Sequence, residues 1–373
     1  MIIAISARNL RSKPHDGVSR FTYETVRRLV QTNRSHEFIL IFDREYDRSL
    51  LFSPNCTGVI LKPGTTNPLN CYLWHEIKLP PLLKKLNAGI FLSPDGIISL
   101  RTNIPQIAVI HDISFYHRRG DLPLFTGIYY RHYYRRFARR AARIITVSEF
   151  CRQDISSYFG IDPSVIDVGW NGVSEYFRPA TEEEKDQFRM SLTGGVPYFL
   201  FVGNFSPRKN IPSLIKAWHL FRQETGMNHR LVLAGGRLFL NSETDRMITL
   251  SPWRDDIILP GSVDHSSLRL YYAAAEALVF VPWFEGFGIP AAEAMRCGTP
   301  VILSSSTSLP EIGGDAALFA DPGNPEEICG LMIKITTGKK LKESLSAGGI
   351  IQSCKFTWEN TAESVNRSLQ KLL

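Results

Sequence analysis

Short hydrophobic runs alternate along the chain with longer stretches in which hydrophobic residues recur at helical spacing. In the first half, the short runs are 2–6, 38–42, 58–61, 90–92, 107–110 and 144–147. Amphipathic stretches, such as 19–31, lie between several of them. This alternation of strand, helix and strand predicts βαβ units built around a mostly parallel sheet.

The same rhythm starts again in the second half, after an interruption at 170–179 (WNGVSEYFRP) that is typical of a domain junction. Strands are predicted at 198–202, 230–234, 257–259, 277–281 and 300–303, and helices at 212–225, 266–275, 290–297 and 325–337. The pattern therefore predicts two doubly wound α/β domains. Because such sheets bind ligands at the carboxyl ends of their strands, we expect functional side chains just after the strands.

Composition adds a preference for anionic partners and an expected compartment. The 373 residues carry a formal net charge of +7. The six cysteines form no CxxC pair and no zinc-type spacing, which favours free thiols in a reducing compartment. The start, MIIAISARNL, lacks the features of a signal peptide, and no apolar run reaches the ~18 residues that span a bilayer. We therefore expect a cytoplasmic protein, either soluble or peripheral on the membrane.

The loop after the predicted strand 277–281 is a candidate phosphate site. It reads EGFGI, from Glu285 to Ile289, and Pro290 suits the first turn of the helix that follows. Glycines let backbone N–H groups approach a phosphate, and a helix N-terminus adds positive potential. The loop also matches the dinucleotide fingerprint GxGxxA. However, the next strand, PVILSSS, ends in serines and not in the acidic residue that binds ribose, which disfavours a dehydrogenase.

Three further features give candidate side chains. Glu285 and Glu293 are eight positions apart. Glu293 is expected in the first turn of the helix, where it would face the same ligand-binding cleft as the loop that carries Glu285. The alternative for Glu293 is a favourable placement in the helix dipole. Arg208 and Lys209 follow the strand 198–202 and suit a diphosphate, the alternative being an exposed basic loop. His111 ends the strand 107–110, where a structural role is the alternative.

Together these residues resemble the retaining GT-B glycosyltransferases of the GT4-like family, over nearly the whole chain. The most specific match is the EX7E pattern, EGFGIPAAE, with the MRCGTPVILSSSTSLPEIGGDAALFADP that follows it. FVGNFSPRKN is the second strong match. Further matches that support the resemblance are VIHD, VSEF and a glycine in the first βα loop. The resemblance implies two Rossmann-like domains facing across a cleft, with 1–170 binding the acceptor and 171–356 the nucleotide sugar. A C-terminal helix at about 357–373 would pack back on the first domain.

The resemblance also implies a role for each matching position. Glu285 would contact the transferred sugar and His111 would line the sugar pocket, as the two candidate catalytic residues. Contacts to the rest of the donor would come from Gly17, Gly203, Arg208, Lys209, Gly261, Val263, Gly286, Phe287, Gly288, Ile289 and Glu293. Within this set Arg208 and Lys209 would hold the diphosphate, Glu293 the ribose, and Gly261 and Val263 would lie beside the base. The first loop departs from the family, since GVSRF has one glycine where many relatives have more.

The sequence predicts catalysis with no metal ion and no cofactor. It contains no Asp-x-Asp, the motif with which other glycosyltransferases bind a metal. Arg208, Lys209 and a helix N-terminus would neutralise the departing diphosphate instead. The family retains anomeric configuration. The departing phosphate oxygen would then deprotonate an acceptor that attacks from the same face.

Residues 116–143 hold eight arginines, one acidic residue and many aromatics, with a helix expected from Thr126 on. Basic aromatic helices lie on anionic membranes, so Arg135, Arg136, Arg139 and Arg140 are candidates for contact with the acceptor or the membrane. The alternative is a core helix with solvated arginines. Nucleic acid is disfavoured, because no nucleic-acid module surrounds the stretch.

These observations predict a glycosyltransferase that moves a hexose from a nucleotide sugar to a glycan or lipid-linked acceptor, in surface polysaccharide or glycolipid biosynthesis. GDP-mannose is the favoured donor, with UDP and dTDP sugars as alternatives. A nucleotide-sugar epimerase of the same architecture and a non-enzymatic nucleotide-sugar-binding protein stay open. The arginine-rich stretch and the paired Arg-Lys and EX7E motifs speak against the epimerase. The intact Glu285, Arg208 and Lys209 speak against the binding protein.

Overall fold

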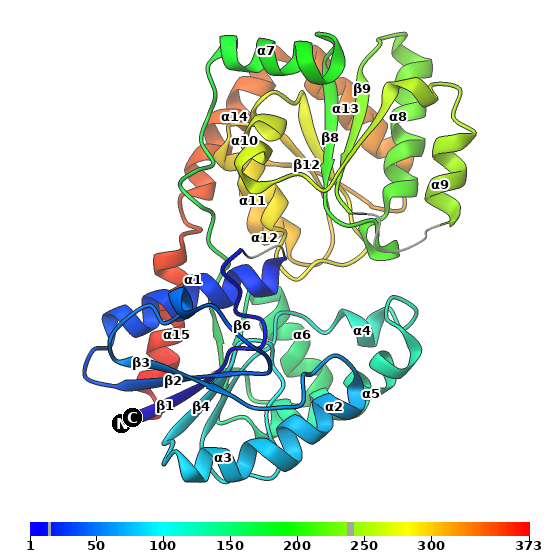
Figure 1. Cartoon of the computed structure of the whole chain (residues 1–373). Coiled ribbons are helices and arrows are strands. Elements are labelled where there is room, and N and C mark those ends of the chain that lie inside the picture. The colour runs from blue at the N-terminus through cyan, green and yellow to red at the C-terminus, as the bar shows by residue number, and fades with distance from the viewer. Residues whose placement is uncertain (14–15, 237–241) are drawn as a thin grey trace. The chain divides into compact units, whose positions relative to one another are not determined.

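The chain forms two compact units, each built around one parallel sheet (Figure 1). The computed structural model describes residues 1–13, 16–236 and 242–373. The first unit comprises Met1–Gly172 and Thr357–Leu373, and the second comprises Val173–Phe356. The chain thus crosses between the units inside the interruption at 170–179. Parallel strands with helical crossovers in both units confirm the predicted α/β class.

The first unit contains a seven-stranded sheet in the order β3-β2-β1-β4-β5-β6-β7. Its strands are β1 (Ile2–Ser6), β2 (Glu37–Phe42), β3 (Cys56–Ile60), β4 (Ile90–Ser93), β5 (Gln106–Val109), β6 (Arg143–Thr146) and β7 (Ile166–Val168). In the centre, Ile3 of β1 pairs with Phe38 of β2 and Ile90 of β4. All described pairings are parallel, so the carboxyl ends of the strands share one edge of the sheet.

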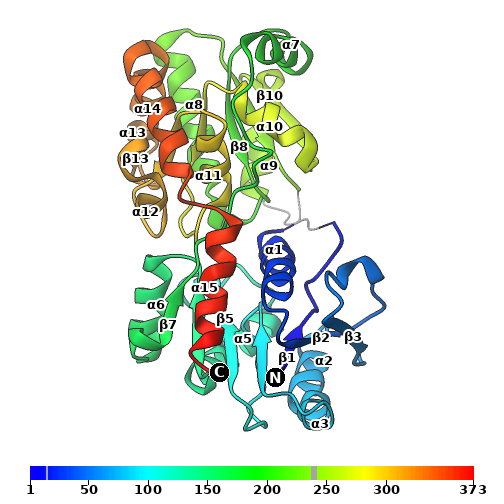
Figure 2. The ribbon, with the colours of Figure 1, turned by 90° about the vertical axis from the view of Figure 1, so that its left-hand side faces the viewer.

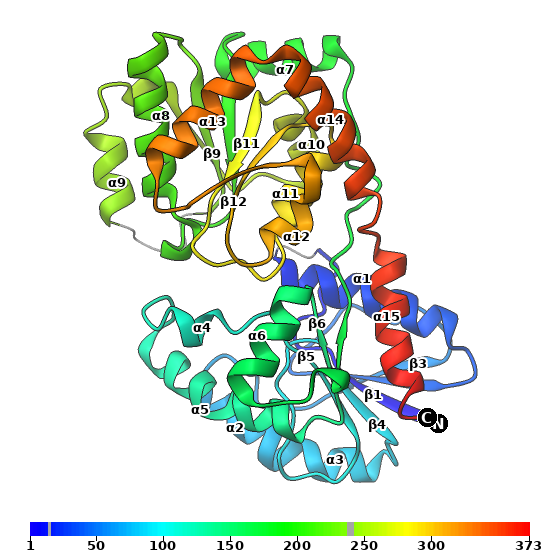
Figure 3. The same ribbon diagram turned by 180° about the vertical axis from the view of Figure 1, so that it is seen from behind.

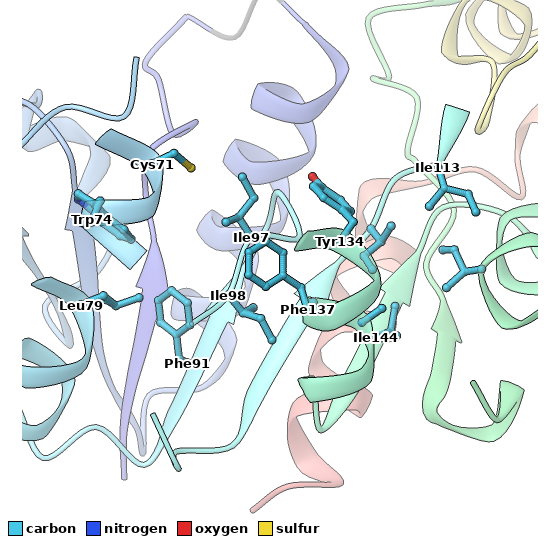
Figure 4. Close-up of a cluster of buried hydrophobic side chains, with 14 of the residues drawn as sticks. Cys71, Trp74, Leu79, Phe91, Ile97, Ile98, Ile113, Tyr134, Phe137 and Ile144 are labelled. Carbon is cyan, nitrogen blue, oxygen red and sulfur yellow. The ribbon is translucent and has the colours of Figure 1, made fainter. Parts of the chain in front are cut away.

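Helices cover both faces of this sheet. They are α1 (Gly17–Thr32), α2 (Pro68–Tyr72), α3 (Leu79–Lys85), α4 (Ser114–His117), α5 (Leu124–Arg140), α6 (Glu149–Phe159) and α15 (Trp358–Gln370). One face packs against α2, α3, α5 and α6, in a core that includes Trp74, Phe91 and Phe137 (Figure 4). On the other face, α1 and α15 lie side by side (Figure 2), and Arg28 forms an ion pair with Glu359 at 2.6 Å. The C-terminal helix is therefore part of the first unit.

The second unit contains a six-stranded sheet in the order β10-β9-β8-β11-β12-β13. Its strands are β8 (Tyr198–Val202), β9 (Arg230–Ala234), β10 (Ile257–Gly261), β11 (Ala277–Phe280), β12 (Val301–Ser304) and β13 (Leu318–Ala320). Its helices are α7 (Glu182–Thr193), α8 (Ile211–Thr225), α9 (Ser242–Thr249), α10 (His265–Ala273), α11 (Ile289–Arg296), α12 (Leu309–Gly313), α13 (Pro325–Thr337) and α14 (Lys339–Ser353). Among them, α8 and α13 pack together along one side of the sheet (Figure 3).

Helix length and polarity bear on membrane insertion. Among the residues that the structure describes, no helix is both long and apolar enough to cross a bilayer.

Candidate active site

Three of the predicted site residues meet at the carboxyl ends of the neighbouring strands β8 and β11. Arg208 and Lys209 lie in a short 3-10 turn after β8, and Glu285 lies in the loop after β11. The Oε2 atom of Glu285 lies 2.5 Å from Lys209 Nζ and 2.9 Å from Arg208 Nη1. The two cations and the carboxylate therefore form one cluster, as expected for residues that follow adjacent parallel strands.

The cluster is a preorganised, positively charged site. Lys209 is only 7% exposed, and its Nζ atom lies 4.8 Å from the centre of the Phe280 ring, a cation–π distance. Burial alone would raise the pKa of Glu285, but Lys209 and Arg208 outweigh burial and lower that pKa. Glu285 is therefore ionised at neutral pH. Two fixed cations against one carboxylate leave the cluster with an excess positive charge that suits an anionic ligand.

Asn210 fixes the Arg-Lys turn, although it is not among the predicted site residues. Its backbone adopts the left-handed conformation (φ 57°), which asparagine tolerates better than most residues. Its side-chain nitrogen donates to the carbonyl oxygen of Val281 at 3.0 Å and to that of Pro322 at 2.7 Å. One buried amide thus ties together the loops after β8, β11 and β13. An Asn directly before a helix with a proline in its first turn is the signal that could have found it.

The loop from Glu285 to Ile289 is held by the segment after β12. The Thr307 hydroxyl accepts from the Glu285 N–H at 3.3 Å. The Ser308 hydroxyl donates to the carbonyl oxygens of Glu285 (2.9 Å) and Phe287 (3.1 Å). The serine- and threonine-rich run that follows β12 thus supports the shape of this loop.

A glycine is required where this loop enters α11. Gly288 has φ 102°, and a Cβ atom there would lie 2.5 Å from a methyl carbon of Leu309. The helix α11 begins at Ile289 with Pro290 as its second residue. Since the first N–H groups of a helix have no acceptor within it, Gly288 and Ile289 lie at an end that favours an anion, and the buried Gly286 precedes them.

Three glycines bring the backbones at the carboxyl ends of β8, β9 and β10 into close contact. The Gly203 N–H donates to the Ala234 carbonyl at 2.9 Å, and the Gly235 N–H donates to the Gly261 carbonyl at 2.8 Å. A Cβ atom on Gly235 would lie 1.8 Å from the Gly203 carbonyl oxygen. Val263 follows two residues after Gly261. Gly235 is not among the predicted site residues, although the Gly-Gly pair directly after the predicted strand 230–234 could have indicated it.

The prediction for the position of Glu293 in its helix is wrong. The helix begins at Ile289, so Glu293 is its fifth residue and lies in the second turn, where helix-dipole placement does not explain it. The helical repeat turns this position inward, and Glu293 is only 3% exposed. Its Oε2 atom accepts a hydrogen bond from the buried Tyr272 hydroxyl at 2.9 Å. The carboxylate is therefore oriented from α10.

In the first unit, His111 follows β5 and is held by the backbone. Its Nε2 atom lies 2.9 Å from the Pro94 carbonyl oxygen, and its ring meets Phe21 of α1 edge-on at 4.9 Å between centroids. Burial lowers the pKa of His111, so its neutral form is favoured. Gly17 lies in α1 as its first residue and not in the preceding loop as predicted, because Asp16 caps the helix.

The four candidate arginines of α5 divide into two pairs. Arg139 donates to the Phe159 carbonyl at 3.0 and 3.2 Å, and Arg140 donates to the Thr102 carbonyl, so both bind the fold itself. Arg135 and Arg136 are exposed. On the inner side, Tyr129, Tyr134 and Phe137 are buried in the core, as the core-helix alternative expects.

The N-terminal end of α5 differs from the rest of the helix. Leu124, Phe125 and Ile128 are 68%, 76% and 50% exposed. The helix begins at Leu124, two residues before the expected Thr126, so this apolar tip belongs to the helix. The membrane hypothesis rested on arginines beside aromatic residues, several of which are buried in the core, whereas the exposed apolar side chains lie at the tip of the helix.

Two family models match the chain in succession. Residues 15–175 match Glycosyltransferase Family 4, and residues 182–351 match Glycosyl transferases group 1. O-antigen chain mannosyltransferase B of Escherichia coli is 31% identical over 368 residues, which cover 95% of this chain and 96% of the relative. The chain therefore belongs to the GT4-like family of glycosyltransferases, and it is an enzyme of that class.

Other relatives and solved structures agree with this family and fold. O-antigen chain mannosyltransferase RfbU of Salmonella typhimurium strain LT2 is 28% identical over 273 residues, covering 72% of this chain and 71% of the relative. The crystal structure of Anabaena Alr3699/HepE in complex with UDP-glucose superimposes with a TM-score of 0.76 over the whole of both chains, at 15% identity. A glycosyltransferase from Rickettsia africae gives a TM-score of 0.74, covering 100% of this chain and 98% of that one, at 16% identity. The fold is therefore GT-B.

Proposed function

We propose that this enzyme transfers a mannosyl residue from GDP-mannose to a glycan or lipid-linked acceptor, with retention of configuration, in the synthesis of a surface polysaccharide or glycolipid. The observation that carries the proposal is the cluster of Arg208, Lys209 and Glu285 after adjacent parallel strands. The choice of mannose is supported by two relatives named as O-antigen chain mannosyltransferases. UDP and dTDP sugars are the alternative donors.

The cluster suggests how donor binding changes the roles of its members. The donor diphosphate would replace Glu285 as the partner of Arg208 and Lys209, because phosphate oxygens form strong charge-assisted hydrogen bonds with both side chains. Glu285 would then accept hydrogen bonds from hydroxyls of the transferred sugar. The same two cations, with the first turn of α11, would stabilise the charge that builds on the diphosphate as the glycosidic bond breaks. These groups would act without a metal ion.

The remaining donor contacts follow from the family. Glu293, oriented by Tyr272, would bind the nucleotide ribose. Gly261 and Val263 would lie beside the base, and the backbone from Gly286 to Ile289 would approach the phosphate and sugar. A departing phosphate oxygen would take the proton from an acceptor hydroxyl that attacks the same face of the sugar, which retains the anomeric configuration.

The first unit would supply His111 to the transferred sugar and Gly17 to the diphosphate. It would also bind the acceptor. For a lipid-linked acceptor, a peripheral contact with an anionic membrane is supported by the exposed tip Leu124, Phe125 and Ile128, with the exposed Arg135 and Arg136 on the same helix.

The deciding experiment incubates the purified enzyme with GDP-mannose, UDP-glucose or a dTDP sugar, with and without an extract of lipid-linked glycans. We expect acceptor-dependent release of GDP from GDP-mannose, an α-linked product by NMR, and no loss of activity in EDTA. Conversion of the free nucleotide sugar to an epimer without acceptor would replace the proposal with the epimerase. Binding without turnover of any donor would replace it with the non-enzymatic alternative. A requirement for Mg²⁺ or Mn²⁺ would refute the metal-free mechanism.

A further inference from the structure

The hydrogen bond between His111 and Pro94 determines which ring nitrogen carries the proton. A carbonyl oxygen only accepts hydrogen bonds, so the Nε2 atom, 2.9 Å away, is the protonated nitrogen. In the neutral ring, Nδ1 then holds a lone pair. Among the described residues, Nδ1 has no hydrogen-bond partner. His111 therefore offers a ligand an acceptor and not a donor.

The Pro94 carbonyl is part of a rigid turn. Residues 93–96 read Ser-Pro-Asp-Gly at the end of β4, and the Gly96 N–H closes the turn on the Ser93 carbonyl at 3.3 Å. The turn packs tightly against the end of β5, since a Cβ atom on Gly96 would lie 3.0 Å from the Val109 carbonyl oxygen. His111 follows two residues after Val109. The carbonyl and the imidazole are thus carried by two adjoining segments.

Asp95 connects this turn to its surroundings. Its Oδ1 atom accepts from the Ser93 hydroxyl at 2.8 Å. Its Oδ2 atom accepts from Arg8 Nη2 at 2.5 Å and from Asn9 Nδ2 at 3.0 Å, both in the segment after β1. The Tyr134 hydroxyl of α5 donates to its backbone carbonyl at 3.0 Å. Contacts from three directions thus hold the residue that follows Pro94.

We propose that Asp95, together with Arg8 and Tyr134, is a positioning residue that holds the Pro94 carbonyl so that His111 presents an unprotonated Nδ1 to a hydroxyl of the transferred sugar. This inference rests on the proposed function, which places His111 at that sugar. A neutral acceptor is the suitable form there, because an imidazolium would repel the positive charge that develops on the sugar ring as its bond to the phosphate breaks.

The surroundings of His111 also favour this neutral ring. Burial, including the packing of Phe21, opposes a charge on the ring. The hydrogen bond to the Pro94 carbonyl favours one, as do the nearby carboxylates of Asp112, Asp95 and Asp16. Burial outweighs all of these and lowers the pKa of His111. The ion pair with Arg8 compensates the negative charge of Asp95 in the turn.

Two isosteric variants test the inference. Tyr134→Phe removes the hydroxyl that holds the turn and keeps the ring in the core. Asp95→Asn removes the charge that binds Arg8. Tyr116→Phe is the matched control, because the Tyr116 hydroxyl also donates to a backbone carbonyl of the first unit, that of Arg131 at 2.6 Å, without touching the turn.

The readout is the ¹⁵N NMR spectrum of the histidine rings in the full-length protein at pH 7.5, beside the rate of GDP release from GDP-mannose. In the wild type and in Tyr116→Phe, we expect His111 as a single tautomer with the proton on Nε2. In Tyr134→Phe we expect a mixture of tautomers and a turnover number lowered about tenfold with little change in KM, since a hydrogen bond contributes ~1–1.5 kcal/mol. Asp95→Asn should show the same change to a larger extent.

A proton on Nδ1 in the wild type would overturn the inference, as would an unchanged tautomer in Tyr134→Phe. Tyr134→Phe carries the test if Asp95→Asn does not fold. A shifted tautomer with unchanged turnover would uphold the positioning of the ring and contradict the placement of His111 at the transferred sugar. The NMR spectrum thus tests the positioning of the ring, and the turnover tests the proposed role of His111 at the sugar, so failure of one can be told from failure of the other.

Discussion

At the scale of single residues, the most informative contact is the one that donor binding would break. The carboxylate of Glu285 forms ion pairs with Arg208 at 2.9 Å and Lys209 at 2.5 Å. A diphosphate would compete with this carboxylate for the two cations. The negative charge of Glu285 therefore opposes donor binding, even though the side chain serves the later chemical step.

This competition predicts a separation of kinetic effects. In Glu285→Gln we expect the affinity for GDP-mannose to be unchanged or higher, because a competing anion is gone, and turnover to fall about ten- to a hundredfold for a lost contact worth ~1.5–3 kcal/mol. In Lys209→Met we expect the Kd of the donor to rise about ten- to a hundredfold. Calorimetry and steady-state kinetics measure both effects.

Lys342→Met is the matched control for these variants. It breaks another lysine–glutamate pair of the second unit, to Glu276 at 2.7 Å, at a place to which no donor role is assigned. Its donor affinity and turnover should equal those of the wild type. Weaker donor binding in Glu285→Gln than in Lys209→Met would show that the carboxylate, and not the cations, holds the donor.

At the scale of secondary-structure elements, Asn210 is the residue that joins three loops of the second sheet. Asn210→Gly keeps the left-handed backbone but leaves the Val281 and Pro322 carbonyls without their donor, and we expect a loss of ~1–3 kcal/mol in unfolding free energy. Asn210→Ala should lose ~1 kcal/mol more, because alanine is strained in this conformation. Urea denaturation measures both losses.

Both Asn210 variants should also weaken donor binding, because Arg208 and Lys209 directly precede the residue. Asn87→Gly is the matched control, since Asn87 is another asparagine with positive φ (52°), exposed in the first unit. It should leave the donor Kd unchanged. Equal donor affinity in Asn210→Gly and the wild type would mean that the Arg-Lys turn keeps its shape without this amide.

The tip of α5 is the second element with a testable role. Leu124→Ser, Phe125→Ser and Ile128→Ser combined should abolish sedimentation with anionic vesicles, because these exposed side chains would enter the lipid interface. Arg135→Gln with Arg136→Gln should weaken it by ~1 kcal/mol per charge, in a salt-dependent manner. Ile351→Ser, which removes an exposed apolar residue of the second unit (71%), should have no effect. Wild-type sedimentation of the triple variant would show that the tip does not contact the membrane.

Most elements, but not all of the site, were predictable from the sequence. The strands β1, β8 and β9 and the helix α13 have the predicted bounds, because each is a strong run between clear breaks. The strands β7 and β13 were missed, since three residues at a sheet edge carry too little pattern. Because ligands bind at the carboxyl ends of parallel strands, Glu285 and Arg208 were expected near each other. The residues around Glu285 in the sequence do not indicate that its carboxylate binds both Arg208 and Lys209.

The roles of Asn210 and Asp95 were not predicted, because both residues act through buried polar contacts with residues distant in the sequence. The partners of Asn210 lie 71 and 112 residues away in the sequence, and those of Asp95 lie up to 87 residues away. Side-chain hydrogen bonds across such separations follow from how strands are ordered in the sheet, and no window of residues contains them. The predicted position of Glu293 in its helix was wrong because α11 begins one residue earlier than predicted, at Ile289.

At the scale of the whole molecule, the first unit should be sensitive to acid because it buries a neutral histidine. His75 is fully buried, and its Nδ1 atom lies 2.8 Å from the Cys71 carbonyl oxygen. Burial, with a smaller contribution from the charge of Arg8, lowers the pKa of His75 to about 3. In the unfolded chain the same ring would have a pKa of ~6.5.

The sign of the effect follows from proton binding. Between pH 3 and 6.5 the unfolded chain binds a proton at His75 that the folded chain does not bind, so stability rises with pH. The full contribution is present above pH ~6.5 and is lost as the pH falls toward the folded value. Each pH unit in this window changes the unfolding free energy by up to ~1.4 kcal/mol, so a loss of ~2–3 kcal/mol is expected between pH 6.5 and 4.5.

His75→Asn isolates this contribution, because the asparagine amide can still donate to the Cys71 carbonyl but does not titrate. We expect the variant to be less stable than the wild type at pH 7.5, since the smaller side chain leaves a cavity beside Trp74. The difference should shrink by ~2–3 kcal/mol when urea denaturation is repeated at pH 4.5. Lowered pKa values at Asp43 and Asp95 act mainly below the ordinary range of aspartate, so they contribute little in this window. The lowered pKa of His111 acts in the same window, but it contributes to wild type and variant alike. A difference between wild type and variant that stays constant from pH 7.5 to 4.5 would mean that His75 takes up a proton without unfolding the first unit.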